Sequence, residues 1–352
     1  MKAAQVKAFG LPSEVLNVSD SVDPPSAPIP DHVLIRVHAV SLSPSDYRML
    51  TGAGDLIKKP PHNKWPYIPG GDLSGVVEQV APNVTRFKPG DHVIGTWDAF
   101  GIGALAELAV VHQKFVELKP PKLSFLEAAA VADSAANALL AVEDARVKAG
   151  DRVLVLGGSG GVGTSLLQLL RRADVSHIVT TSTDKPLCKQ LGADVVINYK
   201  EVDWWKAPEV TEQAFDVMID CAEGSSAWRK ALEHGIVKSR KEGGRFLAVV
   251  VNEWHIEIHN CWQMLSWFLP VVRRVIASRC LGSVSPTYTM MFPAPRGDSN
   301  RRLLDIVEEG GLKVVLDPES PHSFTTKGVH DAFDKMIARK GHGKIVVSIR
   351  DE

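Results

Sequence analysis

A glycine-rich loop between a strand and a helix constrains this chain more than any other feature. Residues 153–163 read VLVLGGSGGVG, in which an apolar strand runs into the pattern G-x-G-x-x-G. In such a loop one glycine permits a tight turn, one lets the backbone approach a pyrophosphate, and one lets the following helix pack close to the strand. The N–H groups at the start of that helix then bind the phosphates. We therefore predict that the whole loop contacts a dinucleotide: Gly158, Ser159, Gly160, Gly161, Val162 and Gly163.

The segments around this loop alternate between apolar strands and helices. We predict strands at 152–156, 177–182, 195–198, 215–221 and 244–251, and helices at 163–172 and 185–191. Strands that are apolar throughout and separated by helices indicate a parallel sheet covered on both faces. Ahead of the first strand, Ser124 and Glu127 form a capping-box pattern that begins an alanine-rich helix predicted to reach Arg146.

The first 120 residues have a different character. Short alternating segments at 3–9, 32–37, 75–80 and 88–95 predict strands, and clusters of prolines near 24–30 and 60–69 predict loops. This pattern is typical of an irregular all-β barrel. The last 60 residues are mixed, with helices predicted at 299–309 and 328–339 and a final strand at 344–349.

Length and charge limit the possible partners. A chain of 352 residues is long enough for two domains, and its 40 basic and 41 acidic residues give a net charge of −1. No overall field is available to hold nucleic acid or an anionic membrane, so neither is expected as a partner. The longest apolar run, around 262–272, is too short for a membrane-spanning helix. The first residues, MKAAQV, lack a signal core, and we expect a cytoplasmic protein.

The four cysteines are scattered along the chain and form no C-x-x-C pair, so buried free thiols are expected. One cluster could bind a metal: His255, Glu257, His259 and Cys261. In a strand these residues share one face, and in a helix the two histidines stack one turn apart. The alternative is a loop or strand with scattered polar residues. We favour that alternative and predict no metal site.

The residues at the end of the second predicted sheet strand, 177–182, indicate whether the cofactor is NADPH or NAD. Thr181, Ser182 and Lys185 supply hydrogen-bond donors and a positive charge that suit the 2′-phosphate of NADPH. An NAD site instead places an acidic residue there, and Asp184 lies near that position. Because Pro186 follows at a first helical turn, we interpret Asp184 as a helix N-cap rather than as a ribose ligand.

Four phrases together resemble the medium-chain dehydrogenases/reductases, in family order and over nearly the whole chain: KPGDHVIG at 88–95, the glycine-rich loop, LGAD at 191–194 and FDVMIDC at 215–221. The resemblance implies a GroES-like β-barrel domain, from residues 1–122 and 293–352, beside a Rossmann domain, from residues 123–292, with a doubly wound parallel sheet that binds NADPH. The active cleft would lie between the two domains. It also implies a homodimer paired through residues 288–292, and a place near the cofactor for Asn137, Tyr199 and Phe292.

The branch of the family follows from two positions. Zinc-dependent members carry cysteine and histidine ligands where this chain has Ser43 and Gly71, and a four-cysteine zinc lobe is absent from the sequence. The chain therefore resembles the zinc-free, NADPH-dependent quinone oxidoreductases. It departs from their pattern at Ser43, where asparagine is usual, and at residues 132–137, which read ADSAAN in place of a Pro-Leu-x-x-x-Thr phrase.

The expected chemistry is hydride transfer without a metal. A simple alcohol or aldehyde would lack a Lewis acid to polarise its oxygen, whereas a quinone or an alkene conjugated to a carbonyl needs less help. Tyr47 is the predicted hydrogen-bond or proton donor, with Ser43 as a weaker donor, although Tyr47 could instead be a buried residue of the barrel wall. Trp65 and Tyr67 could stack on a flat substrate ring or simply pack a proline-rich loop.

Three functions are consistent with these residues. The first is an NADPH-dependent quinone reductase. The second is an NADPH-dependent enoyl or enone (2-alkenal) reductase. The third is a weakly catalytic protein that binds a nucleotide or RNA, which the neutral charge and the lack of a basic run argue against.

Overall fold

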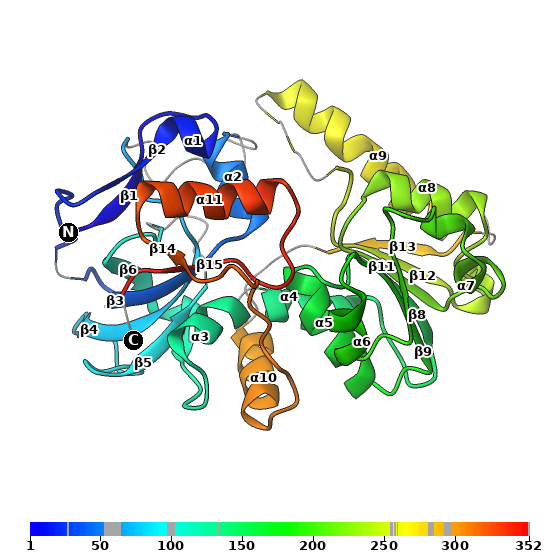
Figure 1. Cartoon of the computed structure of the whole chain (residues 1–352), viewed down its shortest axis with the longest axis horizontal. Helices are drawn as coiled ribbons and strands as arrows, with labels where there is room; N and C mark the ends of the chain where they lie inside the picture. Colours follow the sequence, from blue (N-terminus) through cyan, green and yellow to red (C-terminus); the bar gives the residue numbers. More distant parts are fainter. Residues whose placement is uncertain are drawn as a thin grey trace.

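The structure is a computed structural model that describes residues 1–26, 28–52, 65–96, 103–132, 134–253, 256, 258, 260–280, 285–291 and 297–350. It has two lobes, a β-rich lobe that contains both ends of the chain and a lobe built on a parallel sheet (Figure 1).

The β-rich lobe is built around a seven-stranded sheet. Its order is β14-β15-β3-β4-β5-β7, with β6 paired to β3, and β1 and β2 form a separate antiparallel pair. The strands are β1 (Ala3–Val6), β2 (Leu16–Ser19), β3 (His32–Ser41), β4 (Asp72–Val80), β5 (His92–Gly95), β6 (Leu108–His112), β7 (Val116–Leu118), β14 (His322–Ser323) and β15 (Val346–Ser348). Since β15 pairs with β3, the tail of the chain completes the sheet that the front begins. Three helices accompany it: α1 (Pro12–Val15), α2 (Pro44–Leu50) and α11 (Thr326–Ile337).

The second lobe contains a six-stranded sheet with the order β10-β9-β8-β11-β12-β13, in which every pair is parallel. Its strands are β8 (Arg152–Leu156), β9 (His177–Thr181), β10 (Val195–Ile197), β11 (Val217–Asp220), β12 (Arg245–Ala248) and β13 (Thr287–Met290). From β8 the chain first builds β9 and β10 towards one edge of the sheet. It then returns to β11 on the other side of β8 and builds β12 and β13 towards the opposite edge. The carboxyl ends of β8 and β11 therefore form the switch point at which doubly wound sheets bind ligands.

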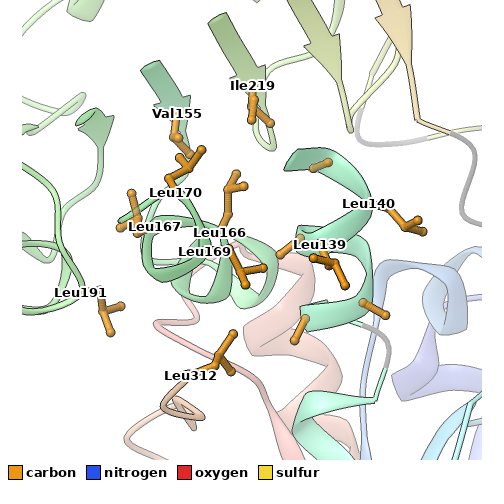
Figure 2. Close-up of a cluster of buried hydrophobic side chains, with 14 of the residues drawn as sticks. Leu139, Leu140, Val155, Leu166, Leu167, Leu169, Leu170, Leu191, Ile219 and Leu312 are labelled. Carbon is orange, nitrogen blue, oxygen red and sulfur yellow. The ribbon is translucent and has the colours of Figure 1, made fainter. Parts of the chain in front are cut away.

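Helices α4 (Ser134–Asp144), α5 (Gly161–Arg172), α6 (Lys185–Gln190), α7 (Pro208–Thr211), α8 (Ser225–Glu233) and α9 (Cys261–Cys280) belong to this lobe. Helix α3 (Phe125–Val131) packs against β3 and β4 of the β-rich lobe. Helix α10 (Gly297–Glu308) packs against α4, and its Leu303 and Val307 join the core of the sheet lobe (Figure 1). Figure 2 shows how α5 is held: its leucines meet Leu139 of α4 and strand residues such as Val155 and Ile219. Each fully buried leucine contributes roughly 1.5–3 kcal/mol, so this face fixes the helix that follows the glycine-rich loop.

The alanine-rich segment begins as predicted and then differs from the prediction. The capping box is present, because the Ser124 amide donates to Glu127 Oε2 at 2.9 Å and the Glu127 amide donates to Ser124 Oγ at 3.2 Å. The segment forms two helices, α3 and α4, rather than one. By length and composition residues 125–144 could cross a membrane, but 71% of that window is buried in the protein, as in a core helix.

Candidate dinucleotide and substrate site

The glycine-rich loop has the geometry that its sequence predicts, except that the tight turn expected at Gly158, the first glycine of the motif, falls one residue earlier. The positive φ of +87° falls on Gly157 rather than Gly158. Gly158 is required for another reason, because a Cβ there would lie 2.2 Å from Thr180 Oγ1 of β9. A Cβ on Gly163 would lie 2.1 Å from the Gly157 carbonyl oxygen, which explains the close packing of α5. A Cβ on Gly160 would meet only that same oxygen, at 3.4 Å, so this position stays open for a ligand.

Two hydroxyls of β9 and the residue after it hold the loop in place. The Gly157 amide donates to Thr181 Oγ1 at 3.0 Å, and Ser182 Oγ donates to Ser159 Oγ at 2.7 Å. Thr181 and Ser182 are both nearly inaccessible to solvent. Their hydroxyls therefore brace the loop, and direct contact of either with a 2′-phosphate stays a prediction.

The start of α5 supplies the anion-binding end of the loop. Gly160 is the N-cap residue and has no side chain to satisfy the first-turn N–H groups. Those groups, with the positive end of the helix dipole, lie beside the switch point. On the other side of the switch point, the buried Asp220 carboxylate accepts hydrogen bonds from the amides of Ala222, Glu223 and Gly224. Burial raises the pKa of Asp220 to about 7, against the opposing effect of these donors.

A cationic segment of the tail reaches the loop from the β-rich lobe. Residues 339–344 read RKGHGK. The Gly343 amide donates to the Ser159 carbonyl at 2.8 Å, and the Arg339 guanidinium donates to the Ala222 carbonyl at 2.8 Å. Lys344 is nearly buried and lies 3.2 Å from Asp72 of β4. The segment thus joins both lobes and brings Lys344, which is paired with Asp72, next to Gly161 of the loop.

Sequence reasoning assigned no site role to residues 339–344. The signal was present, because four basic side chains alternate with two glycines there. It was missed because only the pairing of β15 with β3 brings this part of the tail back across the sheet.

Other predicted cofactor residues lie around the same edge of the sheet. Asp184 caps α6 by accepting from the Leu187 amide at 3.0 Å, which confirms its interpretation as an N-cap. Lys185 is exposed on the first turn of α6, and Tyr199 is exposed just after β10. Asn137 is half-buried in α4, which packs against α5. Phe292 lies outside the described residues.

The positions that hold zinc in related proteins do not suit a metal here. Ser43 is the N-cap of α2, where its hydroxyl donates to Asp46 Oδ2 at 3.0 Å, and Gly71 has no side chain. Across the part of the chain that the structure describes, no group of three or more His, Cys, Asp or Glu side chains could hold a metal ion. His255, Glu257 and His259 of the alternative cluster lie outside that part. The four cysteines are free thiols, but only Cys188 is buried, and Cys261 and Cys280 are exposed.

The predicted substrate residues separate into two groups. Tyr47 is buried in the core of the β-rich lobe and already takes part in an interaction there, which favours the alternative role of a barrel-wall residue. Tyr67 is also buried, and its hydroxyl finds no hydrogen-bond partner among the described residues. Burial and the nearby charge of Asp46 raise the pKa of Tyr67. Its ring lies 5.5 Å from that of Trp65, which in turn lies 5.0 Å from Phe9.

A GroES-like lobe joined to a doubly wound sheet, with a glycine-rich loop at the switch point of that sheet, is the architecture of a two-domain nucleotide-dependent dehydrogenase. The chain matches the alcohol dehydrogenase GroES-like domain family over residues 29–121 and the zinc-binding dehydrogenase family over residues 191–347. It belongs to the medium-chain dehydrogenase/reductase superfamily, among the NAD(P)H-dependent quinone and alkenal oxidoreductases.

The similarity to known proteins extends over almost the full chain. It is 31% identical, over 99% of its length, to the 2-methylene-furan-3-one reductase of Solanum lycopersicum, of which it covers 79%. It is 35% identical, over 96% of its length, to the mitochondrial NAD(P)H oxidoreductase RTN4IP1 of Bos taurus, of which it covers 86%. The structure of the quinone oxidoreductase from Coxiella burnetii is similar with a TM-score of 0.79, 26% identity and 99% coverage of each chain.

Proposed function

We propose that this protein is an NADPH-dependent reductase of quinones that works without zinc. One observation carries the proposal. The two positions that supply zinc ligands in related enzymes hold a serine engaged with Asp46 and a glycine, so no group at these positions could polarise a simple carbonyl or alkoxide strongly. An acceptor that delocalises the incoming charge over its own ring fits such a site.

The residues of the chain would act in three ways. The amides at the start of α5 and the cationic segment 339–344 would bind the phosphates of NADPH, whose nicotinamide supplies a hydride when bound. Lys185 would pair with the 2′-phosphate. Trp65 and Tyr67 would flank a flat acceptor. The buried Tyr67 hydroxyl, which finds no partner among the described residues, would donate a hydrogen bond to the oxygen of an acceptor bound against it.

Reduction of conjugated enones is the second candidate. The support is the similarity to a 2-methylene-furan-3-one reductase over nearly the whole chain. The same donor would serve there, because reduction of an enone also places negative charge on a carbonyl oxygen.

Two further expectations belong to this proposal. The strand β13 is an edge of the parallel sheet, so a homodimer could form by pairing two copies of that edge. Phe292, at the end of the expected pairing segment, lies outside the described residues. A cytoplasmic location stays a prediction from the sequence.

Steady-state oxidation of NADPH with a panel of acceptors tests the proposal. We expect turnover with 9,10-phenanthrenequinone, weaker turnover with 2-alkenals and none with simple aldehydes. Turnover of 2-alkenals or enones without quinone activity would transfer the assignment to the second candidate. Binding of NADPH without turnover of any acceptor would indicate the third, a weakly catalytic nucleotide-binding protein.

A further inference from the structure

Helix α9 presents an apolar stripe to solvent. Trp262, Leu265, Leu269, Val272 and Ile276 are each exposed by 47–80%. Their spacing of three and four residues places all five on an arc about 80° wide, since successive residues of a helix are about 100° apart. Figure 1 shows α9 (yellow) at the periphery of the sheet lobe, next to α8.

The opposite face of α9 anchors the helix to the sheet. Val271 and Ser278 are buried, and Ser278 Oγ accepts a hydrogen bond from the Tyr288 amide of β13 at 3.1 Å. Arg274 donates to the Val251 carbonyl at 3.0 Å and lies over the Tyr288 ring. The second half of the helix is therefore held against β13, with the stripe on its opposite face.

The charges of α9 are of one sign. The helix contains three arginines and no acidic residue. Arg274 is used in the anchor, whereas Arg273 and Arg279 are exposed and lie on either side of the stripe by the helical rotation. The net charge of −1 for the whole chain conceals this local cationic surface.

We propose that the stripe of α9, defined as Trp262, Leu265, Leu269, Val272 and Ile276, binds the surface of an anionic lipid bilayer. An apolar face flanked by arginines, with tryptophan near one end, is the pattern of a helix that lies in the membrane interface. A length sufficient to span the bilayer is not required for this mode. The proposal goes beyond reductase activity and does not depend on it.

The charges favour a membrane over a second copy of the helix. Where two helices pack along a stripe with this spacing, opposite charges beside the seam favour the pairing and like charges oppose it. A second α9 would bring only arginines to that seam, so the two copies would repel each other. An anionic lipid surface attracts the same arginines, and each contributes an affinity factor of about fivefold.

Co-sedimentation of the full chain with vesicles tests the proposal. Vesicles of phosphatidylcholine alone are compared with vesicles that also contain phosphatidylglycerol, at low and high salt. We expect the chain to bind the anionic vesicles at low salt and to bind them more weakly at high salt. Binding to the neutral vesicles should be weaker than binding to the anionic ones. Arg273→Gln should weaken binding about fivefold.

The variant Leu265→Glu/Leu269→Glu should weaken binding at least about 100-fold, because two leucines that the bilayer would bury are lost and two negative charges are added beside the arginines. The control Ile29→Glu/Leu118→Glu makes the same changes at two exposed positions of the β-rich lobe and should bind like the unmodified chain. Thermal melting checks that both variants fold. Their NADPH oxidation with a soluble quinone, without vesicles, should equal that of the unmodified chain, so failure of the proposed activity would not affect this test.

Absence of vesicle binding by the unmodified chain would overturn the proposal, as would equal losses in the two double variants. Size-exclusion chromatography tests the alternative that a second copy of the chain covers the stripe. If Leu265→Glu/Leu269→Glu converts an oligomer to a smaller species and the unmodified chain ignores vesicles, then a second copy covers the stripe.

Discussion

Substituting Gly160 with alanine separates the role of the glycine-rich loop in binding from its role in folding. Gly160 has φ −73° and ψ 174°, which alanine adopts without strain. A Cβ there would meet only the Gly157 carbonyl oxygen, at 3.4 Å. The loss of a favourable N-cap glycine and the gain from a stiffer unfolded chain are of similar size, so the free energy of unfolding should change by no more than about 1 kcal/mol.

The new methyl group would, however, occupy the space that a pyrophosphate needs. If it prevents one charge-assisted hydrogen bond from the loop, about 1.5–3 kcal/mol of binding free energy is lost, a factor of roughly 10–150 in the dissociation constant. Gly163→Ala is the matched control. Its Cβ would lie 2.1 Å from a backbone oxygen, so it should destabilise the fold by about 1–3 kcal/mol.

Calorimetric titration with NADPH and chemical denaturation measure the two effects on each variant. We expect Gly160→Ala to lose affinity and keep its stability, and Gly163→Ala to lose stability. NADPH binding by Gly160→Ala at the affinity of the unmodified chain would refute the assignment of this loop as the pyrophosphate site.

Three further predictions concern single side chains. Lys185→Ala should weaken NADPH binding 10-fold or more and leave NADH binding nearly unchanged. The control Lys189→Ala, at the far end of α6, should change the binding of neither cofactor. Tighter binding of NADH than of NADPH by the unmodified chain would contradict this prediction. Tyr67→Phe should lower kcat and kcat/KM together, by about tenfold for each 1.4 kcal/mol of transition-state stabilisation lost, and Tyr47→Phe should leave both constants near their original values. The reverse pattern would return the donor role to Tyr47. The raised pKa of Asp220, about 7 in place of 3.8, makes the folded state bind the proton more tightly. Its contribution to stability is therefore full below about pH 4 and is lost as pH rises towards 7, by up to about 4 kcal/mol, and denaturation curves should show this slope flattened in Asp220→Asn.

The sequence predicted the parts of the fold that depend on local pattern. The strand from Arg152 to Leu156 and the capping box at Ser124 match the structure at those residues, because burial pattern and cap chemistry are local. The Asp184 cap was also readable, since Pro186 marks a helix start. A positive φ on Gly157 could not be told from one on Gly158, because two adjacent glycines offer the same freedom.

The parts that depend on tertiary contacts were not predictable in this way. No pattern within residues 339–344 shows that they meet Ser159, since that contact depends on a strand pairing more than 300 residues apart. Tyr47 lies beside plausible site residues in the sequence, but α2 turns it into the core. The sequence showed only that the apolar run around 262–272 is too short to span a membrane, and the structure places part of it on an exposed helix face.

We propose above all that a hydride passes from NADPH to a conjugated acceptor without a metal. The most direct measurement compares the rate of 9,10-phenanthrenequinone reduction with NADPH and with NADPH deuterated at the transferred C4 position, using protein dialysed against a chelator and analysed for zinc. We expect full activity with less than one zinc per chain, and a slower rate with the deuterated cofactor. Stoichiometric zinc whose removal abolishes turnover would contradict it.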